Sequence, residues 1–210
     1  MLKLLLFTLV ISLPLLAQES AKIKLPQPQT EGGRPLMETL KLRQSTRTYS
    51  LKPLSLQIIS NLLWAAGGIN RPESGKRTAP TSLNNQEIDI YLAMKDGLYY
   101  YNPKEHSLSV VLKEDIRGLT GKQDFVRDAP LNLVYVADFT RMDRSKEEDK
   151  KIYSAADAAF MAQNVYLWCA SEGLGTVIRA SIDKEPLAQK MKLKPENYVI
   201  FSQTVGYIKD

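Results

Sequence analysis

Residues 163–176 read QNVYLWCASEGLGT, and they predict the end of a long helix followed by a glycine turn. The helix is expected over residues 143–172, because apolar side chains recur at helical spacing through this stretch. One apolar face holds Ala158, Ala162, Val165 and Cys169, with Met161 and Trp168 beside them. Gly173 follows, and glycine is the residue that most often ends a helix. We therefore expect a long helix that is packed through one face.

The elements on either side of this helix predict an α+β layered domain. Helices are expected at residues 35–45, 55–66 and 185–191, the second capped by Ser55 and ended by Gly67-Gly68. Strands are expected at residues 88–94, 98–101, 108–112, 131–137 and 198–208, with 98–101 and 108–112 forming a hairpin. Residues 70–77 are polar and contain Gly and Pro, which is typical of a loop. Helices and strands do not alternate strictly, which argues against a parallel βαβ fold.

The N-terminal stretch is typical of a secretory signal peptide. Residues 1–17 read MLKLLLFTLVISLPLLA, with a positive charge at Lys3, an apolar run and a small residue at Ala17. The run is too short for a membrane-spanning helix, which needs roughly 20 apolar residues. We expect export, with a periplasmic or extracellular protein that has no membrane contact once the signal is cleaved. Residues 18–34, QESAKIKLPQPQTEGGR, are expected to form a flexible arm, and residues 35–210 the folded domain.

Composition excludes several classes of function. The chain of 210 residues has 28 Lys+Arg and 23 Asp+Glu, a net charge of +5, with both signs mixed along it. Nucleic-acid binding normally shows a basic block or stripe, and none is visible. A single cysteine, Cys169, excludes an internal disulfide and a cysteine-based metal cage, and a single histidine, His106, excludes a two-histidine metal site. We expect Cys169 to be a buried apolar side chain and His106 to face solvent in a hairpin turn.

One polar cluster has the chemistry of a phosphate site. Residues 43–47 read RQSTR, so that two guanidinium groups flank a hydroxyl group just after a helix. Arginine forks match phosphate geometry, and a serine hydroxyl adds a neutral donor. The alternative is a solvated helix end, whose cations stabilise the helix dipole.

Two further clusters have the chemistry of a heterocycle site. Residues 77–86, RTAPTSLNNQ, form a polar loop before a strand, and the amides of Asn84 and Gln86 offer both donors and acceptors to a ring edge. Residues 171–176, SEGLGT, contain glycines that let the backbone approach a flat ligand. Each also has a plain alternative, because Asn and Ser make turns and Gly173 alone is an ordinary helix cap.

In this order and spacing, the clusters resemble a known family. The chain is similar to the nitroreductase-like FMN flavoproteins from about residue 42 to residue 207. The resemblance rests on five pieces in sequence: RQSTR, LLWAAGG followed by RTAPTSLNNQ, GLYYYNPKEHSL, QNVYLWCASEGLGT and a closing strand that ends in VGY. The second and third pieces are most similar to the branch that contains the thiazole/oxazole-forming dehydrogenases.

The resemblance implies a fold, a cofactor and a binding site. It implies a three-layer α-β-α sandwich, a homodimer, and FMN at the subunit interface. The residues that match the family's FMN-binding motifs are Arg43, Ser45 and Arg47 for the phosphate; Pro80, Thr81, Ser82, Asn84 and Gln86 for the flavin or ribityl chain; and Gly173, Leu174 and Gly175 near the reactive flavin edge.

This sequence also departs from the family in two places. Family members commonly add a basic residue near the C-terminus to the phosphate site, and here only Lys209 is available. The azoline-forming branch uses a Lys/Tyr pair before the long helix. Lys151 and Tyr153 lie in that region, but the run KEEDKK at residues 146–151 is more typical of a solvated helix face. We therefore assign no catalytic residue and no metal ligand.

The expected activity is that of an exported FMN-dependent oxidoreductase. Its leading substrate class is small electron-poor compounds of the nitro or quinone type, reduced by hydride transfer through the flavin. One alternative is a dehydrogenase that oxidises its substrate, as in the azoline-forming branch. A second alternative is an inactive protein that binds flavin or another small ligand. The electron donor is unknown, and export away from cytoplasmic NADH and NADPH makes a different donor the expectation.

Overall fold

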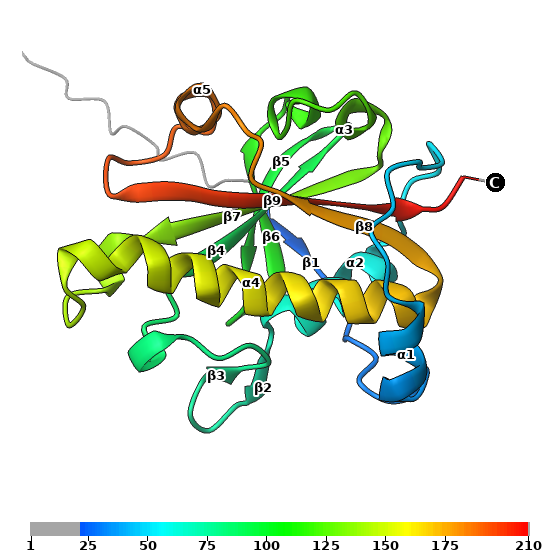
Figure 1. Ribbon diagram of the computed structural model, residues 1–210, viewed down its shortest axis with the longest axis horizontal. Helices are drawn as coiled ribbons and strands as arrows, with labels where there is room; N and C mark the ends of the chain where they lie inside the picture. Colours follow the sequence, from blue (N-terminus) through cyan, green and yellow to red (C-terminus); the bar gives the residue numbers. More distant parts are fainter. Residues whose placement is uncertain (1–21, 210) are drawn as a thin grey trace, which may run out of the picture.

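A seven-stranded antiparallel sheet forms the middle of the molecule (Figure 1). The computed structural model describes residues 22–209, so the expected signal peptide and the first residues of the expected arm lie outside the described residues. Neighbouring strands follow the order β1-β6-β5-β4-β7-β9-β8. These strands are β1 (Lys22–Lys24), β4 (Ile88–Met94), β5 (Gly97–Asn102), β6 (Ser107–Leu112), β7 (Leu131–Asp138), β8 (Leu174–Arg179) and β9 (Asn197–Tyr207). A separate two-stranded hairpin consists of β2 (Ile69–Arg71) and β3 (Lys76–Arg77).

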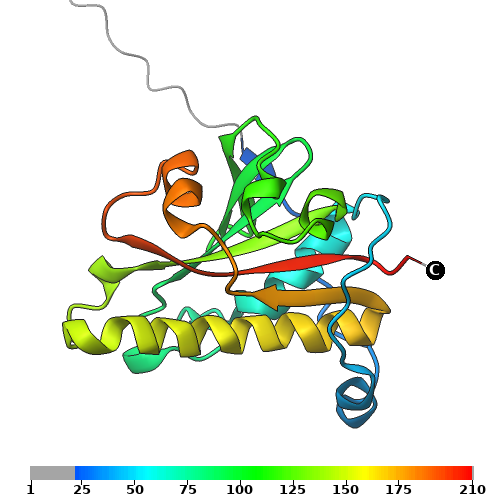
Figure 2. The ribbon, with the colours of Figure 1, turned by 45° about the horizontal axis from the view of Figure 1, so that its top comes forward.

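Helices cover both faces of the sheet (Figure 2). They are α1 (Leu36–Leu42), α2 (Leu56–Gly67), α3 (Phe125–Asp128), α4 (Glu147–Glu172) and α5 (Lys184–Lys190). The long helix α4 and helix α2 lie on one face, with α1 packed against α4, while α3 and α5 lie on the other face. The expected three-layer α+β sandwich is therefore confirmed.

Two apolar cores explain why the central strand β7 is buried along almost its whole length. Successive side chains of a strand point to opposite faces of the sheet. Leu133 thus packs with Met161 and Val165 of α4, while Val134 packs with Leu187 of α5. Because helices cover both faces, β7 carries apolar side chains on both faces, interrupted only by the buried Asn132, instead of an alternating pattern.

The ends of the two principal helices are formed by the expected residues. The Ser55 side chain caps α2 by accepting a hydrogen bond from the backbone N–H of Ile58, at 3.3 Å. Gly173 ends α4 in the left-handed conformation, with φ of 70°, which glycine adopts without steric cost. The two caps therefore fix where each helix stops and where the next segment starts.

The structure differs from the sequence expectations in three segments. Residues 69–77 form the hairpin β2–β3 where a loop is expected, and β8 starts directly after Gly173 where only a turn is expected. The described part of the expected arm is held against the domain. In this part, β1 pairs with β6, the side chain of Leu25 is buried, and the backbone N–H of Gln29 donates to Asn61 Oδ1.

Candidate functional site

The segment after α1 lies against the start of β8. The backbone N–H of Thr46 donates to the carbonyl of Thr176 at 3.0 Å, which aligns residues 43–47 with the glycine turn that follows α4. A Cβ atom on Gly175 would lie 2.8 Å from Thr46 Cγ2, so only glycine permits this approach. The first and third predicted clusters therefore meet in one place.

Tyr166 of α4 contacts both the segment after α1 and strand β8. Its hydroxyl lies 2.9 Å from the hydroxyl of Ser45, and it accepts a hydrogen bond from the backbone N–H of Ile178 at 3.1 Å. The Arg43 guanidinium lies over the Tyr166 ring, 5.4 Å from its centroid. The Tyr166 ring thus contacts Arg43, and the Tyr166 hydroxyl contacts Ser45.

A cavity of about 180 Å³ opens beside this junction. Its lining includes Arg34, Leu42, Thr46, Tyr166, Gly173 and Leu174. Arg43 is half-buried and Arg47 is exposed, and neither forms an ion pair within residues 22–209. Arg34 is the arginine that lines this cavity, whereas Arg43, Ser45 and Arg47 lie beside it and outside its lining.

The second predicted cluster, at residues 80–86, is a tightly held loop. The backbone N–H of Ser82 donates to Asp157 Oδ2 of α4 at 2.8 Å, and the backbone N–H of Gln86 donates to the hydroxyl of Thr81 at 3.0 Å. Leu83, Asn84 and Gln86 all have φ near +50°, a region that side-chain-bearing residues rarely adopt. The loop therefore depends on its neighbours to keep this shape.

Two arginines supply most of that support. Arg141 donates to the backbone carbonyls of Gln86 at 2.9 Å and Glu87 at 3.0 Å, and Arg144 donates to the carbonyl of Leu83. The amide of Gln86 is itself engaged, since its Nε2 donates to the carbonyl of Gly75 at 3.1 Å. The side chain of Asn84 is exposed at the tip, where its Oδ1 accepts a hydrogen bond from Gln86 Nε2 at 3.3 Å.

Within one copy of the chain, the loop and the first junction lie far apart. The loop is anchored at Asp157 and the glycine turn begins at Gly173, which are 16 residues apart along α4. At 1.5 Å per helical residue this is about 24 Å. One chain thus brings together Arg43, Ser45, Arg47, Gly173, Leu174 and Gly175, whereas Pro80, Thr81, Ser82, Asn84 and Gln86 form a second group.

Residues outside the predicted clusters behave differently from the sequence expectation in one case. His106 does not face solvent: its Nε2 lies 2.7 Å from the Ser60 hydroxyl and its Nδ1 lies 3.1 Å from the Tyr101 hydroxyl. Cys169 is buried as expected, and burial raises the pKa of its thiol. Lys151 lies over the ring of Tyr198, which gives it a structural contact.

Sequence reasoning missed Tyr166, Asp157 and Glu87. All three are buried, and each touches a predicted cluster or, for Glu87, directly follows one. A signal was present for two of them, because Asp157 and Tyr166 are polar residues on the face of α4 that carries its apolar stripe. A polar side chain on a buried helix face needs a hydrogen-bond partner. Its presence in the sequence therefore indicates a buried hydrogen bond to another segment.

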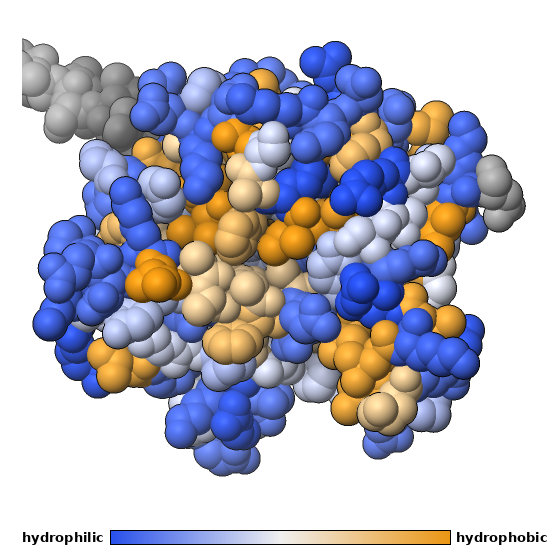
Figure 3. Space-filling model, in the orientation of Figure 1, coloured by the Kyte–Doolittle hydropathy of each residue, from blue (hydrophilic) through white to orange (hydrophobic). Residues whose placement is uncertain are grey.

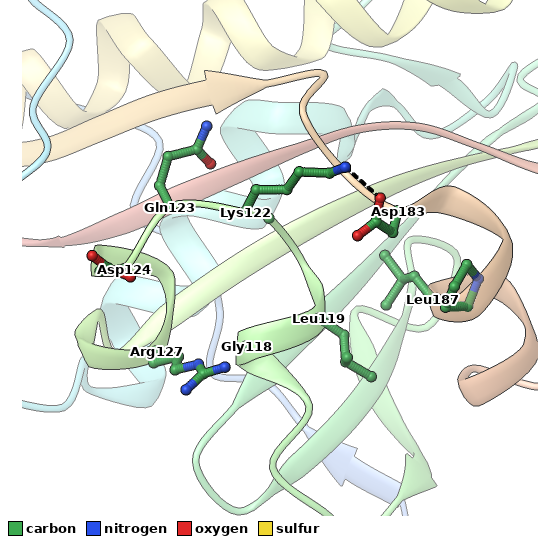
Figure 4. A pocket seen from close by; sticks show the side chains of 10 residues that line it. Gly118, Leu119, Lys122, Gln123, Asp124, Arg127, Asp183 and Leu187 are labelled. Carbon is green, nitrogen blue, oxygen red and sulfur yellow. Dashed lines mark ion pairs between the residues drawn. The ribbon is translucent and has the colours of Figure 1, made fainter.

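Other cavities are separate from these residues. A cavity of about 310 Å³ lies on the opposite face of the sheet, where the ion pair between Lys122 and Asp183 spans 2.5 Å (Figure 4). None of the predicted site residues lines it. No group of three or more His, Cys, Asp or Glu side chains within residues 22–209 is placed to hold a metal ion, and no helix in that range is long and apolar enough to cross a membrane.

Comparison with known proteins identifies the family. The family model described as the nitroreductase family matches residues 40–207. A protein of Methanocaldococcus jannaschii that is named a nitroreductase is 31% identical over 181 residues, covering 81% of this chain and 90% of that protein. The crystal structure of a protein from Ralstonia eutropha, also described as a nitroreductase, is 44% identical with a TM-score of 0.87 and covers 92% of both chains.

The fold also matches a chain of the E. coli microcin synthetase McbBCD complex with truncated pro-MccB17 bound. That match has a TM-score of 0.71 and 20% identity, and covers 98% of this chain and 85% of that chain. This similarity is one of fold. The chain therefore belongs to the nitroreductase family of oxidoreductases.

Proposed function

We propose that this protein is an exported FMN-dependent oxidoreductase that reduces small electron-poor compounds of the nitro or quinone type. The observation that carries the proposal is the junction of Arg43, Ser45 and the glycine turn beside one cavity. Family membership supports the reaction class, and the junction supports the cofactor.

The donor set at the junction fits the phosphate of FMN. A phosphate is bound best by charge-assisted hydrogen bonds, and the guanidinium groups of Arg43 and Arg47 supply them. Ser45 adds a neutral donor between the two charges. Gly173 leaves room for a flat ring, because a Cβ atom at this position would meet no other atom within 4 Å.

The separation of the two clusters supports a homodimer. The loop at residues 80–86 and the glycine turn are both expected at the flavin ring, which is far shorter than the separation of about 24 Å along α4. In a twofold pair, the loop of one copy faces the junction of the other.

Exposed apolar side chains support the same assembly. They gather over α1 and along α4 (Figure 3), and they include Leu36, Met37, Leu40, Ile152 and Phe160, with exposed fractions of 44% to 75%. Exposed apolar surface of this extent is typical of protein interfaces. We propose that it is covered by the second copy.

The reaction places few demands on the side chains of this protein. FMN, when bound, supplies hydride transfer to and from small molecules. The protein binds the phosphate, orients the ring and leaves one ring face open to the substrate. The single histidine, His106, is engaged in a structural contact with Ser60 and is not needed for this chemistry.

Export sets the electron donor. Residues 1–17 are expected to direct the chain out of the cytoplasm. NADH and NADPH are scarce outside the cytoplasm. We propose that a partner protein, another reduced small molecule or the substrate itself reduces the flavin. Cell fractionation and stopped-flow reduction test this: a cytoplasmic, uncleaved protein that is rapidly reduced by micromolar NADH or NADPH would contradict it.

The function is tested on the purified full chain. We expect a yellow protein that releases FMN on denaturation, and bound FMN that is reduced by a donor and reoxidised by a nitroaromatic compound or a quinone. Tight flavin binding without reduction by any donor would indicate a binding protein. Reduction of the flavin by a heterocyclic substrate that is itself oxidised would indicate a dehydrogenase.

A further inference from the structure

A fully buried carboxyl group follows the loop at residues 80–86. Glu87 has no exposed surface, and neither of its carboxyl oxygens accepts a hydrogen bond from a donor in the described part of the chain. A buried carboxylate without donors is strongly destabilising, because it has lost its hydration and gained nothing in return. The group therefore needs another way to remain in the interior.

The carboxyl group of Asp157 provides it. Asp157 Oδ2 accepts the backbone N–H of Ser82 at 2.8 Å, and its carboxyl group is the neighbouring acidic group that acts on Glu87. Two ionised carboxylates are both acceptors, so a hydrogen bond between them needs a shared proton. Burial, followed by the interaction with Asp157, raises the pKa of Glu87 to about 7. Burial also raises the pKa of Asp157, but the contact with Glu87 and the Ser82 N–H act to lower it, so the proton belongs to Glu87.

The charged groups around this pair do not neutralise it. Arg141 contacts the backbone carbonyl of Glu87, but its charge is paired with Asp89 at 2.6 Å and Asp138 at 3.3 Å. Arg77 donates to the carbonyl of Ile88. From α4, the nearby Ser154 hydroxyl acts to lower the pKa of Glu87, but its hydrogen bond goes to the sulfur of Met142 at 3.3 Å. Loss of the proton from Glu87 would therefore leave two negative charges in contact.

We propose that Glu87 and Asp157 form a one-proton latch that positions the loop at residues 80–86. In the closed state, protonated Glu87 donates to Asp157, and Asp157 accepts the N–H of Ser82. When the proton leaves to bulk water, the two carboxylates repel each other, and Asp157 releases Ser82. The strained loop, with three residues near φ of +50°, then loses an anchor. Only the effect of the latch on cofactor binding rests on the proposed function.

The first test needs no cofactor. Carbon-13 NMR of glutamate-labelled full-length protein follows the Glu87 carboxyl group, assigned by its loss in Glu87→Gln, while the backbone amide of Ser82 is followed in parallel. We expect Glu87 to titrate between pH 6 and 8, with the Ser82 amide shifting at the same midpoint. A midpoint below pH 5.5, no titration up to pH 9, or a Ser82 amide that does not follow Glu87 would overturn the latch.

The second test asks whether the latch acts on the proposed site. FMN affinity is measured at pH 6.0 and 8.5. If only the closed state binds, affinity falls by up to roughly thirtyfold, because the closed fraction falls from about 90% to about 3%. Glu87→Gln, whose amide always donates to Asp157, should remove this pH dependence. Glu114→Gln, a surface carboxyl group paired with Lys190 on the other face, should keep it.

The two tests separate the two proposals. If Glu87 and Ser82 titrate together but FMN does not bind at any pH, the latch stands and the proposed function fails. If FMN binds with the same pH dependence in Glu87→Gln and the wild type, the positioning role of the latch is overturned, whereas the proposed function stands.

Discussion

The hydroxyl groups of Ser45 and Tyr166 lie 2.9 Å apart, and this contact fixes the direction of a short hydrogen-bond chain. The Tyr166 oxygen already accepts the backbone N–H of Ile178. Tyr166 is buried, and Ser45 is the acceptor that its own hydrogen reaches among the described residues. Tyr166 therefore donates to Ser45, and the Ser45 hydrogen is left without an acceptor within residues 22–209.

Replacing Tyr166 by Phe should weaken FMN binding by about threefold to tenfold, the value of one hydrogen bond. The ring under Arg43 is kept, so the change isolates the hydroxyl group. Fluorescence titration with FMN measures the effect, and Tyr153→Phe on the exposed side of the same helix is the control. Both residues belong to the same chain of hydrogen bonds. The loss of FMN affinity in Ser45→Ala should therefore increase little when Tyr166→Phe is added. Full additivity in this double-mutant cycle would separate Tyr166 from the site.

Replacing both Arg43 and Arg47 by Ala should lower FMN affinity at least a hundredfold. Each charge-assisted hydrogen bond contributes about 1.5–3 kcal/mol, and the variant loses two. The matched control is Arg71→Ala with Arg127→Ala, which removes the same charge from other parts of the surface. Unchanged FMN affinity in the first variant would remove both arginines from the site.

Local pattern was sufficient for most of the fold. The alternation in β4 and the helical spacing in α2 predicted both elements closely, because each has a cap or turn at its ends and an apolar face that packs on the sheet. The three candidate clusters were also visible, since they consist of consecutive residues. Their division into two groups about 24 Å apart was not, because it depends on the length of α4.

The remaining differences come from contacts between residues distant in sequence. Strand β8 was missed because Gly173 and Gly175 are typical of a turn, and the strand is stabilised by pairing with β9. His106 was expected in solvent because its neighbours Lys104 and Glu105 are polar, yet its partner Ser60 lies 46 residues away. The segment at residues 22–34 is rich in Gln, Pro and Gly, but a strand pairing and buried Leu25 hold its described part to the domain.

A mixing experiment should reveal a site shared between two copies. One variant carries Arg43→Ala and Arg47→Ala, and the other carries Asn84→Ala and Gln86→Ala, so that neither binds FMN well alone. In a mixed dimer, the intact loop of the first faces the intact arginines of the second, and up to one FMN per dimer should bind. No recovery on mixing, with subunit exchange verified by sedimentation or mass spectrometry, would place each site within one chain.

Acidification should weaken the packing around His106. The Ser60 hydroxyl donates to the carbonyl of Pro26, so His106 Nε2 donates to Ser60 and Nδ1 accepts from Tyr101. A second proton on Nδ1 would oppose the Tyr101 hydrogen bond, and burial lowers the pKa of the imidazole below 6.5. The unfolded chain then binds more protons than the folded one just below pH 6.5, so the free energy of unfolding falls as the pH decreases.

Glu87 acts in the opposite direction, since its raised pKa makes the free energy of unfolding fall as the pH rises from 4.5 to about 7. Denaturant unfolding of the wild type, His106→Asn and Glu87→Gln between pH 5 and 8 separates the two effects. Asn suits the φ of 47° at this position, and its variant should lose only the acid-side decrease. If the wild type and His106→Asn lose stability equally below pH 6.5, another group titrates there and the imidazole is not the cause.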